Sequence, residues 1–368
     1  MFADRLARAR RAMAHHDVDA LLLSVGADLP YLTGYEAMPL ERLTMLVVPR
    51  DGEATLVVPA LEAPRVVERP EVFTVRPWTE SEQPIDIVAD LVGARQALAI
   101  GDQTWSGFLV DLQAALPASA FHRASGVMSE LRAVKDEAEV ASLRRAAAAV
   151  DRIAGRLQGG EIPVLGRTEA ELSAELGRQI VDEGHHRVNF AIVAAGANAA
   201  SPHHEPGSRV IGAGEVVLCD FGGTMLDEWG VGYCSDITRC VHTGSPPGEF
   251  TELYDVLHEA QQASVGAATV GTPAEAVDAA GRAIIDAAGY GAYFIHRTGH
   301  GIGVEAHEDP YIVEGNGTPL TAGHAFSVEP GIYVPGRWGA RLEDIVVAAD
   351  AGPDALNRAD HRLAVIDG

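Results

Sequence analysis

The stretch TGHGIGVEAHEDP, residues 298–310, combines two histidines and three acidic residues with three glycines and a proline. Glycine and proline disfavour a helix, so a loop or a short strand is predicted here. Glycine also allows a backbone to approach a ligand closely. Imidazole and carboxylate groups are metal donors, but a polar surface loop can have the same composition. This segment alone leaves both interpretations open.

Two aspartates stand inside apolar, strand-like runs upstream of this segment. Asp220 lies in VVLCDFGG (216–223), and Asp236 lies in GYCSDITR (232–239). A buried aspartate is costly unless it is paired or binds a metal. Two of them on adjacent strands of one hairpin would repel each other without a cation between them.

Two glutamates complete the pattern downstream. Glu329 precedes a Pro-Gly pair in SVEPGIY (327–333), and Glu343 begins an apolar run in RLEDIVV (341–347). Together with His300, the four carboxylates form a set of hard oxygen donors with one nitrogen, which suits manganese or cobalt better than a structural zinc site. Two divalent cations would neutralise four carboxylates. Any single acid could equally form a salt bridge or a cap, so the argument depends on the whole set.

The rest of the chain predicts two domains. Up to about residue 125, strand-like and helical runs alternate, which indicates an α/β domain. The expected strands are 20–24, 43–49, 54–59, 72–78 and 97–100, separated by helical runs at 85–96 and 106–116. One long helix over 128–157 is expected to open a second, α+β domain, so the predicted division is 1–127 and 128–368.

The second domain is expected to contain three further helices, at 168–184, 249–269 and 273–288. Thr168 and Glu171 have the spacing of a capping box at the start of the first of these. Strands are predicted in the runs NFAIVAAG, EVVLCDFGG, YCSDITRCVH, AFSVEPGIYV and ARLEDIVVA. Every candidate metal donor falls in this domain.

Composition excludes several classes of protein. A formal net charge of −24 argues against binding to nucleic acid, whose phosphates would be repelled. The sequence has no run of 18 apolar residues, so no membrane span and no membrane partner are expected. The three cysteines are an odd number without a CxxC pair, which favours a reducing, cytoplasmic location.

As a set, the segments SPHHEP, DFGG, GYCSDITR, TGHGIGVEAHE, VEPGIY and RLED resemble the motifs of the pita-bread metallopeptidases of the creatinase, aminopeptidase P and prolidase type. Their order and spacing are most similar to the bacterial Xaa-Pro dipeptidases and Xaa-Pro aminopeptidases. The segment ADLPYLTGYEA (27–37) resembles part of a creatinase-like N-terminal domain. The resemblance implies that such an α/β domain precedes an α+β pita-bread catalytic domain.

The resemblance also assigns site residues. The implied metal ligands are Asp220, Asp236, His300, Glu329 and Glu343, with Asp236 and Glu343 bridging two divalent ions. The expected metal is manganese, with cobalt or zinc as alternatives. The implied catalytic residues are Glu329 as general base, His203, His307 and Arg341, of which the last three would also bind the substrate.

One departure from the family pattern occurs in the hairpin after Asp220, whose tip at 224–231 carries extra residues. Asp227 in this tip is a rival ligand, which we reject because DFGG matches the motif. Cys219 and Cys234 are expected to be structural. The histidines at 185, 186 and 204 are expected on the surface, whereas those at 296 and 324 receive no role.

The implied function is hydrolysis of the Xaa-Pro bond at the amino end of short peptides by a hydroxide bridging two metal ions. Dipeptidase and aminopeptidase activities both fit, and the short chain favours the dipeptidase. The resemblance implies a homodimer. The alternative is a catalytically inactive pita-bread binding module. Methionine aminopeptidase is disfavoured by residues 1–125, and metal-free creatinase is disfavoured by the intact donor set.

Overall fold

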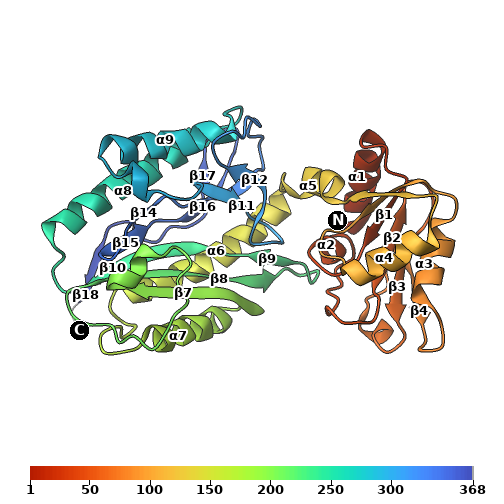
Figure 1. Ribbon diagram of the computed structural model, residues 1–368, viewed down its shortest axis with the longest axis horizontal. Helices are drawn as coiled ribbons and strands as arrows, with labels where there is room; N and C mark the ends of the chain where they lie inside the picture. The colour runs from red at the N-terminus through yellow and green to blue at the C-terminus, as the bar shows by residue number, and fades with distance from the viewer. Residues whose placement is uncertain (367–368) are drawn as a thin grey trace. The chain divides into compact units, whose positions relative to one another are not determined.

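The computed structural model describes residues 1–366, which form two compact units (Figure 1). The first unit comprises Met1–Arg132 together with Asp227–Val231, the tip of the extended hairpin. The second comprises Ala133–Leu226 and the chain from Gly232 onward. The units divide after Arg132, a few residues beyond the boundary expected from the sequence.

The first unit is built on a six-stranded mixed sheet with the strand order β4-β3-β2-β1-β5-β6. Its strands are β1 (Ala20–Leu23), β2 (Met45–Pro49), β3 (Ala54–Pro59), β4 (Phe73–Trp78), β5 (Ala97–Ile100) and β6 (Ala120–Arg123). Its helices are α1 (Phe2–His15), α2 (Asp28–Thr33), α3 (Pro84–Val92), α4 (Ser106–Ala115) and α5 (Ser125–Arg132), with the 3-10 turn η1 (Ala63–Arg65). The α/β architecture and the five expected strands are confirmed. Neither α2 nor β6 was predicted.

The single long helix expected over 128–157 is wrong. The chain forms α5 and then α6 (Glu137–Gln158), and residues 133–136 separate the two helices. The Asp136 side chain accepts a hydrogen bond from the Glu139 backbone N–H, and the Glu139 carboxylate accepts one from the Asp136 N–H. This capping box begins a new helix in the middle of the run. The box expected at Thr168 and Glu171 is confirmed at the start of α7 (Glu169–Asp182).

The second unit contains two larger sheets and a hairpin. The first sheet has the order β18-β10-β8-β7, with β9 paired to β8; the second has the order β12-β11-β13-β16-β17; and β14 pairs with β15. The strands of the first sheet are β7 (Arg187–Ala195), β8 (Val216–Leu226), β9 (Gly232–Cys234), β10 (Ile237–Thr243) and β18 (Ala364–Ile366). Those of the second sheet and the hairpin are β11 (Gly299–Gly301), β12 (Glu308–Ile312), β13 (Ala325–Val328), β14 (Gly331–Val334), β15 (Trp338–Arg341), β16 (Asp344–Val347) and β17 (Asp354–Ala355).

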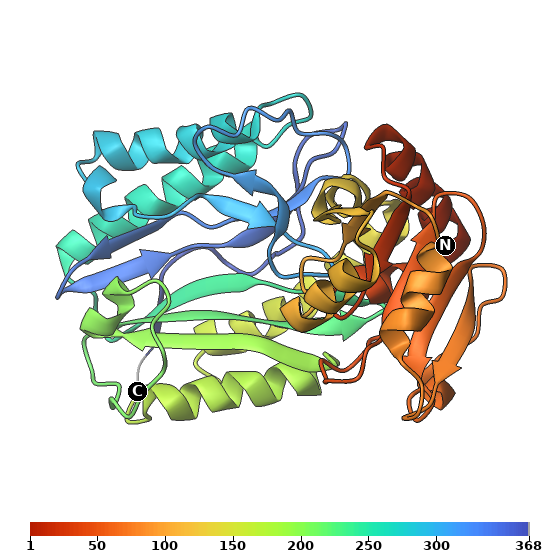
Figure 2. The ribbon, with the colours of Figure 1, turned by 45° about the vertical axis from the view of Figure 1, so that its right-hand side comes forward.

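Helices cover these sheets from two sides. Helices α6 and α7 pack on one face of the first sheet, whereas α8 (Gly248–Ala267) and α9 (Ala274–Ala287) lie together along the opposite side of the second unit from α7 (Figures 1 and 2). Shorter 3-10 turns occur at η2 (Gly196–Ala200) and η3 (Gly291–Tyr293). The two helices expected at 249–269 and 273–288 are thereby confirmed.

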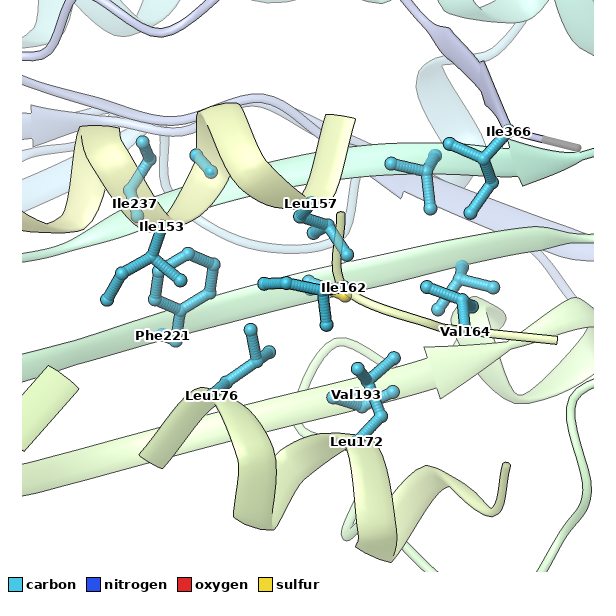
Figure 3. Packing of buried hydrophobic residues seen from close by; sticks show 14 of the residues in the cluster. Ile153, Leu157, Ile162, Val164, Leu172, Leu176, Val193, Phe221, Ile237 and Ile366 are labelled. Carbon is cyan, nitrogen blue, oxygen red and sulfur yellow. The ribbon is translucent and has the colours of Figure 1, made fainter. Parts of the chain in front are cut away.

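Strand β8 contributes to two cores because successive side chains of a strand point to opposite faces. Cys219 and Phe221 pack with α6 and α7 in the cluster that Figure 3 displays, which also contains Leu172 and Leu176. Leu218 faces the other way and packs in a cluster with residues of α8 and of β14 and β15. A strand buried on both faces forms a rigid support for Asp220. Among residues 1–366, no helix is long and apolar enough to cross a membrane.

Candidate metal centre

Three of the predicted donors lie where a strand is interrupted. Asp236 falls between β9 and β10, Glu329 between β13 and β14, and Glu343 between β15 and β16. The sequence placed Asp236 inside a strand, which is wrong, whereas Glu329 was expected before a Pro-Gly turn and Glu343 at the start of an apolar strand, although the predicted strand runs passed through both. At each break the preceding strand ends one or two residues before the acid. Asp220 lies within β8, and His300 is the middle residue of the short strand β11, where a loop or a short strand was expected.

The structure brings all five predicted donors together. The donor atoms of Asp236, His300 and Glu343 all lie within 4.8 Å of one another, and the three residues are buried. His300 Nε2 is 3.1 Å from Glu329 Oε1. Arg341 connects Asp220 to the other donors. Its guanidinium forms an ion pair with the Asp220 carboxylate, and its Nε lies 3.9 Å from Glu329 Oε2. Segments that are far apart in the sequence therefore meet at one point.

Burying these carboxylates together is unfavourable in free energy unless a cation neutralises them. Within the described part of the chain, Asp220 Oδ1 and Asp236 Oδ1 are buried without a hydrogen-bond partner. Burial, followed by the neighbouring carboxylates, raises the pKa of Asp236 and of Glu343 well above the ordinary values. Burial would also raise the pKa of Glu329, but the hydrogen bond and the charge of His300 lower it to about 2. Unpartnered carboxylate oxygens beside an imidazole are a donor set that fits divalent cations.

Further polar groups orient these donors. Thr238 Oγ1 donates to Glu343 Oε2 at 2.7 Å. Ser327 Oγ donates to Glu329 Oε1 at 3.2 Å and accepts from the His300 backbone N–H at 3.1 Å. His300 Nδ1 lies 3.1 Å from the Gly301 carbonyl, which can only accept, so the proton is on Nδ1. Nε2 is the ring nitrogen that faces the carboxylates, and a cation bound there would displace the proton that Nε2 shares with Glu329.

Arg341 is buried and bonded to protein groups on several sides. Besides Asp220, it donates to Thr238 Oγ1 at 3.1 Å, to Tyr333 Oη at 2.8 Å and to the Pro202 carbonyl at 3.3 Å. The Tyr333 hydroxyl in turn lies 2.9 Å from His296 Nε2. Sequence reasoning missed Thr238, Tyr333 and His296. Tyr333 ends the VEPGIY motif and Thr238 lies within SDITR, so both could have been found from the motifs already quoted.

The two other predicted catalytic histidines remain accessible. His203 is exposed in the segment after η2. The ring centroid of His307 is 3.9 Å from that of His300. Partial desolvation, and then the charge of His300, lower the pKa of His307 to about 4. The structure thus places His307 beside the donor cluster, with its side chain open to solvent.

Two of the histidines expected on the surface are buried or half-buried. His185 is buried, with Nδ1 at 3.1 Å from the Ile180 carbonyl and Nε2 at 2.8 Å from Ser235 Oγ. His204 is half-buried and bonded to Glu169 at 2.8 Å. Both expectations were wrong because the polar partners come from distant segments. The expectation of an exposed His186 is confirmed.

The remaining polar candidates have local roles. Asp227 Oδ1 accepts hydrogen bonds from the backbone N–H groups of Trp229 and Val231, both at 2.8 Å, and so caps the hairpin tip. His324 is buried, and its Nδ1 accepts from the Thr321 N–H at 3.2 Å. The three cysteines are free and buried. Burial raises the pKa of Cys234 and of Cys240 to about 11.

A second group with metal-binding spacing, His15, His16 and Glu130, differs in kind from this cluster. Its three side chains are exposed, and both imidazoles contact Glu130 Oε2, at 3.4 and 3.1 Å. Solvent can satisfy every one of these groups. The buried cluster is therefore the candidate centre.

Comparison with known proteins identifies the class. Residues 141–350 match metallopeptidase family M24, and residues 5–134 match the creatinase/prolidase N-terminal domain. The chain belongs to the M24 metallopeptidases and is a metal-dependent hydrolase. Its fold is a creatinase-type domain followed by a pita-bread domain. The expected family, fold class and enzyme class are confirmed.

Individual relatives match over almost the whole chain. The probable dipeptidase PepE of Mycobacterium tuberculosis is 42% identical over 370 residues, covering 100% of this chain and 97% of the relative. The Xaa-Pro dipeptidase of Lactobacillus helveticus is 36% identical and covers 95% of each chain. The crystal structure of a prolidase from Thermococcus sibiricus superposes with a TM-score of 0.92 at 36% identity, covering 100% of this chain and 99% of the other. The chain is accordingly a prolidase-like peptidase of this family.

Proposed function

We propose that this protein hydrolyses the Xaa-Pro bond at the amino end of short peptides, as an Xaa-Pro dipeptidase or an aminopeptidase P-like enzyme. The observation that carries the proposal is that five donor side chains lie together, and that two of them, Asp220 and Asp236, each have a buried carboxylate oxygen without a hydrogen-bond partner. The names of the relatives, dipeptidase and prolidase, favour the dipeptidase form.

The donors suit a pair of divalent cations, which we propose to be manganese, with cobalt or zinc as alternatives. Asp220, Asp236, His300, Glu329 and Glu343 would hold them, with Asp236 and Glu343 shared between the two. When bound, such cations lower the pKa of water and so supply a hydroxide nucleophile at neutral pH. The same cations would neutralise the carboxylates whose burial is otherwise unfavourable.

The chain's own groups would perform the proton transfers and the binding. Glu329 accepts the proton of the attacking water as general base, a role open to a carboxylate that lies within the donor cluster. His203 stabilises the oxyanion that develops on the scissile carbonyl. His307 lines the proline side of the bond. Arg341 orients Asp220 and contributes to binding the carboxyl-terminal part of the substrate.

One assay tests the function. Protein reconstituted with manganese should cleave Xaa-Pro dipeptides, with lower activity on Xaa-Pro-Xaa tripeptides and little on matched Xaa-Ala dipeptides. The dipeptide-to-tripeptide ratio distinguishes dipeptidase from aminopeptidase. A metal-loaded protein that is inactive on both would contradict the proposal and favour the binding module.

Glu343→Ala tests the donor assignment separately. The variant should remain folded, lose at least one equivalent of bound metal by elemental analysis, and lose peptidase activity, because Glu343 is proposed to be shared between the two cations. Full metal content together with full activity would mean that Glu343 is not a ligand.

A further inference from the structure

Glu169, the first residue of α7, is a fully buried carboxylate outside the donor cluster. It accepts five hydrogen bonds: from Ala195 N at 2.9 Å, from Asn198 Nδ2 at 3.0 and 3.2 Å, from His204 Nε2 at 2.8 Å and from Gly207 N at 3.4 Å. Burial alone would raise its pKa, but these hydrogen bonds, that of Ala195 first, hold the pKa below the ordinary value. An anion at neutral pH therefore joins α7 to the end of β7, to η2 and to the segment that follows.

That segment, SPHHEPG (201–207), carries His203 and contains neither helix nor strand. It is held on both sides of His203. On one side the Pro202 carbonyl accepts from Arg341 Nη1 at 3.3 Å, and on the other His204 and Gly207 bond to Glu169. The His204 N–H donates to the Ser201 carbonyl at 3.2 Å and closes a turn, in which His204 is directed inward to Glu169 and His203 is exposed.

We propose that Glu169 is a positioning residue for the peptidase reaction: it fixes the segment 201–207 so that His203 is held at the angle and depth at which it meets the substrate. This inference rests on the proposed function, which gives His203 its contact with the scissile carbonyl. Backbone hydrogen bonds also hold the segment, at Ser201, at His204 and from the Ala170 N–H to the Gly207 carbonyl at 3.0 Å, but Glu169 is the buried side chain that binds His204, the neighbour of His203. A displacement of about 1 Å in such a group can reduce the rate by roughly 100-fold.

A double-mutant cycle tests whether Glu169 acts through His203. Full-length wild type, Glu169→Ala, His203→Ala and the double variant are loaded with manganese and assayed on one Xaa-Pro dipeptide, after metal content has been checked. Glu169→Ala should lower kcat by roughly 100-fold in the wild type but by less than about twofold when His203 is already absent, because the two effects are coupled. An equal loss in both backgrounds would overturn the proposal.

Glu171→Ala is the matched control. It removes an exposed glutamate of the same helix start, whose hydrogen bonds of the capping box reach Thr168, so it weakens the first turn of α7 but removes no side-chain bond to the segment 201–207. This variant should keep the wild-type kcat, and a loss equal to that of Glu169→Ala would overturn the proposal. If Glu169→Ala does not fold, Glu169→Gln replaces it in the double-mutant cycle, because glutamine keeps the side-chain volume and removes the charge.

Hydrogen exchange separates this inference from the proposed function. In Glu169→Ala the amides of residues 198–208 should exchange at least about tenfold faster than in wild type, since Glu169 then no longer holds them, and in Glu171→Ala they should not. Unchanged exchange in Glu169→Ala overturns the inference. A wild-type protein without peptidase activity would count against the proposed function alone, because the exchange experiment still decides whether Glu169 holds the segment.

Discussion

Thr238 links two residues of the candidate centre through one hydroxyl. Its Oγ1 donates to Glu343 Oε2 and accepts from Arg341 Nε. Thr238→Val keeps the shape of the side chain but leaves a buried carboxylate oxygen without its donor. We expect metal affinity to fall roughly 10- to 100-fold with little change in overall fold, measured by manganese titration calorimetry and circular dichroism. Thr238→Ser keeps the hydroxyl and should bind metal as the wild type does. Wild-type affinity in the valine variant would show that this hydrogen bond does not tune the centre.

His324 predicts a pH dependence of stability that is independent of the metal centre. Burial, and then the charge of Lys135, lower its pKa from 6.5 to about 4. As pH falls below 6.5 the unfolded chain takes up a proton that the folded chain refuses, so stability decreases between about pH 6.5 and 4. A shift of this size corresponds to roughly 3 kcal/mol in the free energy of unfolding.

The measurement is urea unfolding of the protein at pH 7 and at pH 5. His324→Asn should reduce the loss of stability between these two values, whereas the same substitution at the exposed His186 should leave it unchanged. An identical loss in wild type and His324→Asn would rule out the buried imidazole as its source.

At the residue scale, the sequence correctly indicated those acidic residues whose burial requires a partner. Asp220 and Asp236 stand in apolar runs, and that cost could be read without a structure. His185 and His204 could not be placed, because their partners, Ser235 and Glu169, lie far from them in the sequence. Polar residues around a histidine do not reveal whether a distant carboxylate or hydroxyl will cover it.

At the scale of elements, the apolar periodicity predicted most of the strands but missed β6, β12, β17 and β18 and did not predict every interruption. The run through Asp236 looks continuous, yet β9 ends at Cys234 and β10 begins at Ile237. Strand propensity reflects how side chains pack on a sheet. It therefore does not predict a break in a strand where a carboxylate turns towards a site formed with other segments. The division between α5 and α6 was missed for a different reason, since the cap at Asp136 is local and could have been recognised.

The core between α6, α7 and the sheet supports β8 and hence Asp220. Leu176 of α7 is fully buried in this core (Figure 3). Leu176→Ala should lower the free energy of unfolding by about 2–5 kcal/mol, because it removes apolar contact and leaves a cavity. Urea unfolding measures this loss. Val181→Ala, on the same helix but 50% exposed, should change stability by less than about 0.5 kcal/mol. Equal effects in the two variants would contradict this account of the core.

At the scale of the whole molecule, helix α4 leaves apolar side chains exposed on the surface of the chain. Its sequence SGFLVDLQAA is rich in hydrophobic residues, but Leu112 is the one side chain of this helix that is fully buried. Val110 is 60% exposed, and the neighbouring Trp105 is 44% exposed and stacks on Phe108. A helix that is apolar on most sides is ordinarily covered. Two-fold homodimers are the commonest assembly, so we expect a second copy of the chain to cover α4.

The full-length protein should therefore sediment as a dimer, at twice its chain mass of 38.8 kDa. Val110→Asp would place a charge in the interface and should raise the dimer dissociation constant at least about tenfold, the effect of roughly 1.4 kcal/mol. Leu165→Asp is the matched control, because Leu165 is 41% exposed but lies in the other unit. Sedimentation velocity across a concentration series measures both variants. A monomeric wild type would contradict the dimer, whereas a dimer unaffected by Val110→Asp would place its interface away from α4.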